Sequence, residues 1–304
     1  ALSRAREAQC CGGTLEVLEH MKTRVLSAVA LLPLLLVIVL VLPAWATAAL
    51  FGAAAAVAAY ELLYRTGMVK NLRLVVYAMV MAVLVSFWSL RQDPNLAHLG
   101  VLAYLALLFG EMLLAHGRLR FEKVCLCLAA GLLLPYLLTA LVRIRAMYAG
   151  ADPGQNDLGK YYILVAFVIA FTADSGAYFV GRALGKHKLA PVISPNKTIE
   201  GAVGGMLCAV LFMGLYGLIL TKAFQFDVIY WYGAVYGVLG AGASILGDLG
   251  FSAIKRQMNI KDYGDLIPGH GGILDRFDSM MLVAPLVELL LRMLPFAVPT
   301  LGVG

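Results

Sequence analysis

Long apolar runs separated by short polar turns fill most of the 304-residue chain. Each run is close to 20 residues long, which lets an α-helix cross a hydrocarbon core about 30 Å thick. The pattern therefore predicts an all-α polytopic membrane protein and excludes a water-soluble globular one. We expect nine spans, at about 25–42, 44–63, 72–90, 96–115, 121–142, 160–181, 200–221, 228–250 and 277–296.

Composition supports the membrane prediction. Hydrophobic residues make up 62% of the chain and charged residues 14%, whereas soluble domains are roughly half apolar and a quarter charged. The net charge of +6 comes from basic residues scattered among short loops, so we expect no nucleic-acid partner. The five cysteines fit no zinc or disulfide framework.

The polar residues divide the chain into three parts. Residues 1–20 lack helical periodicity and precede Met21, so we interpret them as a leader or an expression remnant. Residues 21–150 carry few unusual polar groups and are expected to be scaffold helices. Residues 151–304 hold most of the unusual groups and are expected to be catalytic.

Basic residues also predict the orientation. Sixteen Lys and Arg residues fall in one set of alternate loops, and five fall in the other set. Positively charged loops stay in the cytoplasm. The N-terminus and the loops at 182–199 and 251–276 are therefore expected on the cytoplasmic side.

Four aspartates lie in or at the ends of the predicted spans: Asp174, Asp248, Asp275 and Asp278. Carboxylates at such depth are unfavourable and need a partner or a task. We expect all four at one cleft at the membrane surface, where oxygen ligands suit Mg²⁺ and substrate phosphates. The alternative is structural: Asp275 or Asp278 would cap the last span, and Asp174 would pair with Arg182.

A second polar group occupies residues 181–205. Ser194, Asn196, Lys197 and Thr198 precede Glu200 and a glycine-rich helix start. Lysine, hydroxyl and amide groups beside a helix N-terminus can hold an anion. A plain cytoplasmic loop with Thr198 as helix cap is the equal alternative.

The densest polar run is 252–279, in which Gly269, Gly271 and Gly272 precede the last span. Glycines let backbone N–H groups approach a pyrophosphate closely. Neither the Walker pattern nor G-x-G-x-x-G occurs, so ordinary P-loop and Rossmann sites are excluded. His270, set between glycines and near the aspartates, is as suited to contacting substrate as to a structural role.

This run, S-x-x-K-R-x4-K-D-x-G-x2-I-P-G-H-G-G-x2-D-R-x-D, resembles the signature of the phosphatidate cytidylyltransferases, also called CDP-diacylglycerol synthases. Two upstream segments resemble other motifs of that family in the same order: D-S-G-A-Y-x-x-G-R at 174–182 and S-P-N-K-T-I-E-G at 194–201. The resemblance covers about residues 170–280. The chain departs from the family at Phe251, where an acidic residue is common, and at Tyr263, where serine is common.

The resemblance implies transfer of CMP from CTP to phosphatidic acid, giving CDP-diacylglycerol and pyrophosphate. It further implies Mg²⁺, with K⁺ beside it, a homodimer, and Asp248 and Asp275 as metal ligands. The expected catalytic residues are Asp248, Lys255, Arg256, Asp275 and Asp278. The expected substrate-binding residues are Asp174, Ser194, Asn196, Lys197, Thr198, Glu200, Ser252, Lys261, Asp262, His270, Gly271, Gly272 and Arg276.

Two other functions fit parts of the pattern. An ion-coupled transporter would use Asp174 and Asp248 as a site between broken helices, but the sequence has no matched halves and its polar residues gather at one face. A related lipid enzyme, making a CDP-activated archaeal lipid or phosphorylating a polyprenol, would need the same groups. In a bacterium, the protein is expected in the inner membrane.

Overall fold

The computed structural model describes residues 33–91, 93–115, 119–147, 158–266 and 271–299. Helices dominate these residues, which confirms the all-α prediction. The elements are α2 (Ala44–Tyr60), η1 (Glu61–Arg65), α3 (Leu72–Arg91), α4 (Pro94–Leu114), α5 (Phe121–Leu128), η2 (Ala129–Leu133), α6 (Leu134–Leu138), α7 (Ala140–Ala146), α8 (Leu158–Leu184), β1 (Lys188–Ala190), β2 (Ser194–Thr198), α9 (Ile199–Phe224), β3 (Phe226–Val228), α10 (Tyr230–Gln257), α11 (Leu274–Phe277), α12 (Met280–Met293) and β4 (Ala297–Pro299). The η elements are π-helical turns.

Seven helical stretches among the described residues are long and apolar enough to cross a membrane: Ala44–Arg65, Leu72–Arg91, Pro94–Leu114, Phe121–Ala146, Leu158–Leu184, Ile199–Phe224 and Tyr230–Gln257. The chain is thus an integral membrane protein. The first predicted span, 25–42, lies partly outside the described residues, and its described residues 33–40 are helical. The ninth corresponds to α12, whose 14 residues extend about 21 Å, less than the usual hydrocarbon thickness. The count of nine therefore stays a prediction.

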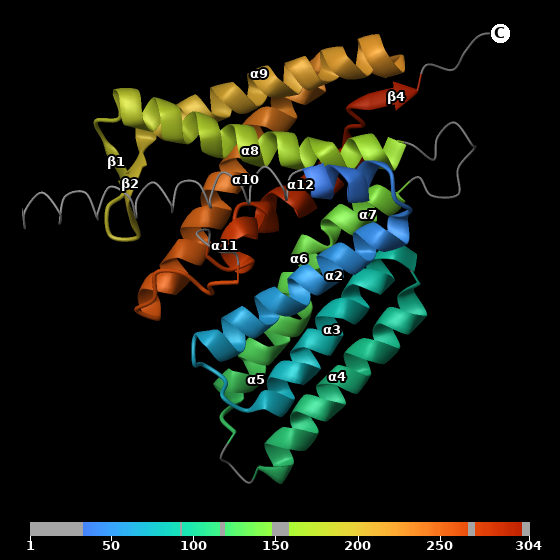
Figure 1. The fold of residues 1–304 in the computed structure, drawn as a ribbon, viewed down its shortest axis with the longest axis vertical. Coiled ribbons are helices and arrows are strands. Elements are labelled where there is room, and N and C mark those ends of the chain that lie inside the picture. Colours follow the sequence, from blue (N-terminus) through green and yellow to red (C-terminus); the bar gives the residue numbers. More distant parts are fainter. Residues whose placement is uncertain (1–32, 92, 116–118, 148–157, 267–270, 300–304) are drawn as a thin grey trace, which may run out of the picture.

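The core of the molecule joins the two halves of the sequence. Its buried side chains include Phe51 on α2, Leu74 on α3, Leu141 on α7, Ile163 on α8 and Val287 on α12. Figure 1 shows α2, α3 and α4 side by side, with α8 and α9 running together across the other end of the molecule. Most of the unusual polar residues lie after residue 150 in the sequence. The hydrophobic core, however, includes residues from both sides of this division.

Small residues let α8 and α9 pack closely. A Cβ added to Gly205 would lie 2.6 Å from the carbonyl oxygen of Ala173, and one added to Gly201 would lie 2.7 Å from that of Ala177. Larger side chains would push the helices apart, since close approach of membrane helices depends on small residues. This contact fixes α9, and the strand before it, against the middle of α8.

Both cytoplasmic loops predicted from the sequence contain regular structure. In the first, β1 pairs with β2 in an antiparallel hairpin, with Lys188 opposite Thr198 and Ala190 opposite Ser194. In the second, α10 continues to Gln257. Ser252, Lys255 and Arg256 therefore lie on a helix rather than in a loop.

Candidate active site

A cavity of about 620 Å³ lies where the ends of α8, α9 and α10 meet β2 and α11. All four predicted aspartates line it, so the expectation that they meet at one cleft is confirmed. Its polar lining comprises Asp174, Tyr178, Arg182, Asn196, Lys197, Thr198, Asp248, Asp275, Asp278 and Ser279.

Asp248 lies on α10, one turn before Ser252. The Ser252 hydroxyl donates a hydrogen bond to its Oδ1 at 3.1 Å. Lys197, at the end of β2, places Nζ 2.5 Å from Oδ2. The hairpin therefore delivers a cation to this carboxylate, and both side chains stay about a quarter exposed, at 26% and 27%.

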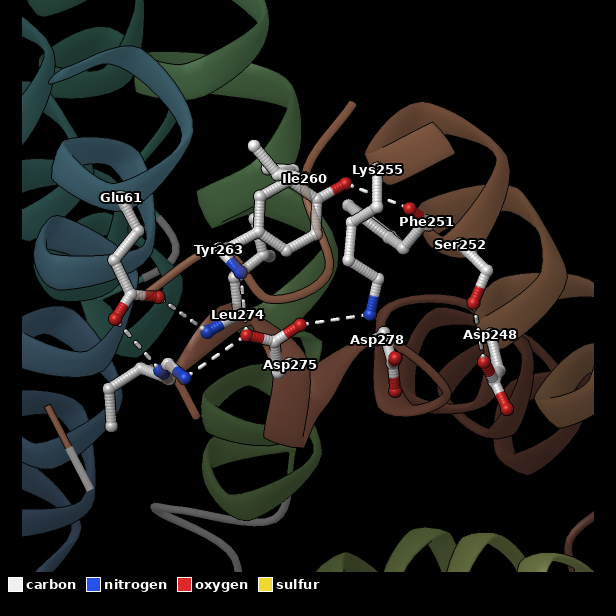
Figure 2. A network of polar contacts seen from close by, with 12 residues as sticks. Glu61, Asp248, Phe251, Ser252, Lys255, Ile260, Tyr263, Leu274, Asp275 and Asp278 are labelled. Carbon is white, nitrogen blue, oxygen red and sulfur yellow. Dashed lines mark hydrogen bonds and ion pairs between the residues drawn. The ribbon is translucent and has the colours of Figure 1, made fainter. Parts of the chain in front are cut away.

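Asp275 is held by donors from three places in the chain. Its Oδ2 accepts the backbone N–H groups of Tyr263 at 2.8 Å and Gly272 at 3.0 Å. Its Oδ1 accepts the Lys255 ammonium at 2.9 Å. The aspartate and lysine side chains are only 4% and 10% exposed. Figure 2 shows Asp275, Asp278 and Asp248 in succession beside Lys255.

Asp174 and Asp278 share Ser279 as a partner. The Ser279 hydroxyl donates to Asp174 Oδ2 at 3.0 Å, and the Ser244 hydroxyl donates to Asp174 Oδ1 at 2.8 Å. The Ser279 backbone N–H donates to Asp278 Oδ1 at 2.8 Å. Asp174 thus links α8 with α10 and the start of α12. Asp174 therefore bonds to serines and not to Arg182, the alternative partner. Arg182 instead donates a hydrogen bond to the Tyr178 hydroxyl.

Two glycines bring backbone close to the acidic groups. A Cβ on Gly247 would lie 2.7 Å from the carbonyl oxygen of Asp278, so only glycine lets α10 pack there. Gly271 has φ of +83°, a backbone conformation that favours glycine. A Cβ on it would lie 3.2 Å from Asp275 Oδ2 and 3.6 Å from Asp262 Oδ1. Gly271 and Asp262 therefore lie beside the cavity wall.

Tyr263, one of the two positions that depart from the resembled motif, acts in packing. It is 1% exposed, and its hydroxyl donates to the carbonyl oxygen of Phe251 at 2.9 Å. Burial raises the pKa of this hydroxyl above its ordinary value, so it stays protonated and able to donate. The ring also lies 5.5 Å from the Lys255 ammonium. Tyr263 and Phe251 therefore support the lysine and the loop.

Other predicted residues lie away from the cavity. Exposed Arg256 donates to the carbonyl oxygens of Ile193 and Ile260. The Glu200 carboxylate lies 2.6 Å from Nδ1 of His187 and accepts its backbone N–H, which orders the turn before β1. Ser194, Lys261 and Arg276 also do not line the cavity, and neither do five residues near it: Ser252, Lys255, Asp262, Gly271 and Gly272. His270 lies outside the described residues.

Thr198 serves two purposes. Its hydroxyl accepts the backbone N–H of Gly201 at 3.1 Å, which confirms it as the cap of α9. It also lines the cavity together with Asn196. The capping interpretation and the anion-binding interpretation of this segment are therefore compatible.

Sequence reasoning missed several polar residues at or near the site. Ser244 and Ser279 give no signal of their own, since isolated serines are common in membrane helices. Glu61 does give a signal, because it is a carboxylate at the end of a predicted span. The same signal identified Asp174 as a candidate. Its carboxylate accepts the N–H groups of Ile273 and Leu274, next to Asp275.

The cavity offers carboxylate oxygens, the ligands that Mg²⁺ prefers. Among the described residues, no group of three or more His, Cys, Asp and Glu side chains could by itself hold a metal ion. Mg²⁺ commonly binds through one or two carboxylates together with waters and substrate phosphates. Asp248 and Asp275 are two cavity carboxylates that could hold such an ion.

Comparison with known proteins identifies the class. Residues 22–294 match the model of the cytidylyltransferase family, and the chain belongs to that family. Similar proteins include several that are named phosphatidate cytidylyltransferase. The one from Staphylococcus haemolyticus is 34% identical over 274 residues, covering 89% of this chain and 99% of its own length. The one from Staphylococcus saprophyticus is 40% identical over 185 residues, which are 61% of this chain and 65% of the relative.

Proposed function

We propose that the protein is a phosphatidate cytidylyltransferase, which transfers CMP from CTP to phosphatidic acid and releases pyrophosphate. The observation that carries the proposal is the cavity in which four aspartates meet Lys197, with Lys255 bound to one of them. The three sequence motifs supply these residues, and the family match supports the same reaction.

The reaction needs charge neutralisation more than a strong base. An oxygen of the lipid phosphate attacks the α-phosphorus of CTP, the bond between the α-phosphorus and the bridging oxygen breaks, and pyrophosphate leaves with that electron pair. Lys197 and Lys255 provide positive charge for the phosphates. The polar side chains Asn196 and Thr198 orient the nucleotide phosphates beside the start of α9.

Asp248 and Asp275 are the proposed ligands of Mg²⁺, with K⁺ nearby. A bound divalent ion would supply Lewis-acid stabilisation of the phosphate charge. Asp248 and Asp275 would hold the metal, and Lys197 and Lys255, which form ion pairs with these carboxylates, would add positive charge for the substrate phosphates. The carboxylate oxygens of Asp248 and Asp275 support the proposal that the cavity binds a metal.

The cavity is proposed to face the cytoplasm, in the inner membrane of a bacterium. Its wall includes the ends of α8 and α10, and the segments 182–199 and 251–276 carry eight of the 24 Lys and Arg residues, which favours the cytoplasmic side. The β1–β2 hairpin, the C-terminal end of α10 and the turn after α2 lie toward the same side of the molecule (Figure 1). CTP from the cytosol and lipid from the bilayer can both reach such a site.

The homodimer remains a proposal based on the family. The mass of the detergent-solubilised protein, corrected for bound detergent, tests it. A mass of one chain would contradict it.

The deciding experiment measures pyrophosphate release by the purified protein with CTP and phosphatidic acid. Release should require both substrates and Mg²⁺, stop with EDTA, and resist competition by ATP, GTP and UTP. Diacylglycerol is the matched control, because it carries a hydroxyl in place of the phosphate whose oxygen attacks CTP. No release from folded protein would contradict the proposal and favour a related lipid enzyme.

A further inference from the structure

Glu61 lies far from the catalytic motifs in the sequence but beside them in space. It begins η1, the π-helical turn that ends the first described span. It is 2% exposed. Its Oε1 accepts the Ile273 N–H at 3.0 Å, and its Oε2 accepts the Leu274 N–H at 2.9 Å (Figure 2).

The loop opposite Glu61 is shaped to admit its carboxylate. A Cβ on Gly264 would lie 2.4 Å from Oε1, and a Cβ on Gly272 would lie 2.5 Å from Oε2. Both glycines therefore let the backbone come close to the two carboxylate oxygens. Arg65, at the other end of η1, forms an ion pair with Asp265 of the same loop. η1 thus contacts this loop through both of its charged residues.

The short helix α11 needs such an outside partner. It has four residues, too few to be stable alone. Helix starts leave N–H groups without partners, and Ile273, the residue before α11, has an apolar side chain that cannot accept them. Buried N–H groups require an acceptor. Glu61 supplies two acceptors from another helix.

Holding α11 also holds Asp275. Leu274 directly precedes it, and Gly272, packed against Glu61, donates its N–H to Asp275 Oδ2. The backbone around residues 272–274 is therefore fixed by one carboxylate on each side: Glu61 from the first half of the chain and Asp275 from within the motif. Movement of this segment would move Asp275 relative to Lys255 and Asp248.

We propose that Glu61 is a positioning residue that sets Asp275 in the cavity for the cytidylyl transfer; the inference rests on that proposed function. Glu61 does not line the cavity, so it acts through the backbone at Ile273 and Leu274. The half of the chain expected to be scaffold then contributes to the site.

The test compares Glu61→Gln with Glu111→Gln in the full-length protein in detergent. Glutamine keeps the size of the side chain but presents an NH₂ group to one of the two N–H donors. Glu111 is the matched control because it is also a glutamate in the first half, contacts Tyr77 and Arg73, and lies on α4. Glu61→Asp keeps two acceptor oxygens on a shorter side chain and serves as the rescue variant.

The first measurement is hydrogen exchange of the segment 271–277 without metal or substrate. Glu61→Gln should speed its exchange by about tenfold or more, with the α8–α9 contact unchanged. In Glu61→Asp the exchange rate of this segment should lie between those of Glu61→Gln and the unsubstituted protein. In Glu111→Gln it should equal that of the unsubstituted protein. Unchanged exchange in Glu61→Gln, or equal loosening of α8–α9, would overturn the inference. This readout is independent of whether the protein uses CTP.

The second measurement is the dependence of activity on Mg²⁺. A displaced Asp275 should lower kcat by about tenfold or more and raise the Mg²⁺ concentration that gives half activity. An equal response in Glu111→Gln, or lower activity with unchanged Mg²⁺ dependence, would overturn the role assigned to Glu61.

Discussion

Individual carboxylates in this protein are surrounded by donors that the rest of the chain provides. Asp174 has two serine hydroxyls, Asp248 has Ser252 and Lys197, and Asp275 has two backbone N–H groups and Lys255. These hydrogen bonds and ion pairs are needed because a buried or half-buried charge without partners is unfavourable. The same partners fix the orientation of each carboxylate.

Asp275→Asn and Asp248→Asn should each reduce turnover by roughly 100-fold or more, because each replaces a proposed metal ligand by a neutral amide. Turnover and membrane insertion are measured for both. Asp227→Asn is the control, since Asp227 lies exposed in β3, away from the cavity. Near-normal turnover in either variant would remove that residue from the metal site.

Lys197→Ala should raise the KM for CTP about tenfold, because a charge-assisted contact to phosphate is lost. Initial rates over a range of CTP concentrations test this. Lys188→Ala is the control: Lys188 is an exposed lysine on the partner strand of the same hairpin. A KM that stays unchanged in Lys197→Ala would contradict the phosphate contact.

Among the elements, the α8–α9 pair shows why glycines are placed unevenly. Gly205 faces Ala173 closely, while a Cβ on Gly214 of the same helix would meet nothing within 4 Å. The sequence displays both glycines without separating their roles. Only the position of the neighbouring helix does so.

Gly205→Ala should destabilise the protein by about 1–3 kcal/mol, because its methyl group overlaps the Ala173 carbonyl. Gly214→Ala should be neutral or slightly stabilising, since alanine favours helix more than glycine. Thermal unfolding of both variants in one detergent measures the difference. Equal unfolding temperatures would contradict the close contact.

The described spans were predictable because long apolar runs dominate the sequence. The polar last turns of a helix such as α10 were not predictable from such runs. Asp248 and Ser252 are four residues apart, the spacing of neighbours on one helix face. This spacing indicates that α10 continues, but the polar composition favoured a loop. The turn before β1 depends on Glu200 accepting the backbone N–H groups of Lys186 and His187, contacts across thirteen and fourteen residues that local patterns do not specify.

At the scale of the whole molecule, a buried ion pair joins the halves of the chain away from the cavity. Arg143 Nε of α7 lies 2.8 Å from Glu288 Oε2 of α12, and both side chains are 11% exposed. Arg143 also donates to Ser89 and to the carbonyl oxygen of Tyr136. The convergence of the aspartates could be predicted from their rarity, but this pair could not, since its members are 145 residues apart.

Arg143→Met should lower the free energy of unfolding by roughly 1.5–3 kcal/mol, because Glu288 loses a buried charged hydrogen bond and keeps only Arg292 as an ion-pair partner. Arg120→Met should change it little, since the Arg120–Glu122 pair is more than 70% exposed on both sides. Thermal unfolding compares them. Similar effects in the two variants would show that the buried pair contributes nothing special.

The contact between Glu61 and Leu274 also sets an order in time. The two residues are 213 positions apart, and a ribosome adding roughly 5–20 residues per second needs on the order of ten to forty seconds to travel between them. During that interval the carboxylate enters the bilayer with the first helices and has no α11 to bind. A nascent chain therefore has no Asp275 and no α11 for Glu61 to hold until residues 272–275 are made, and a protein truncated before Gly272 should release no pyrophosphate from CTP.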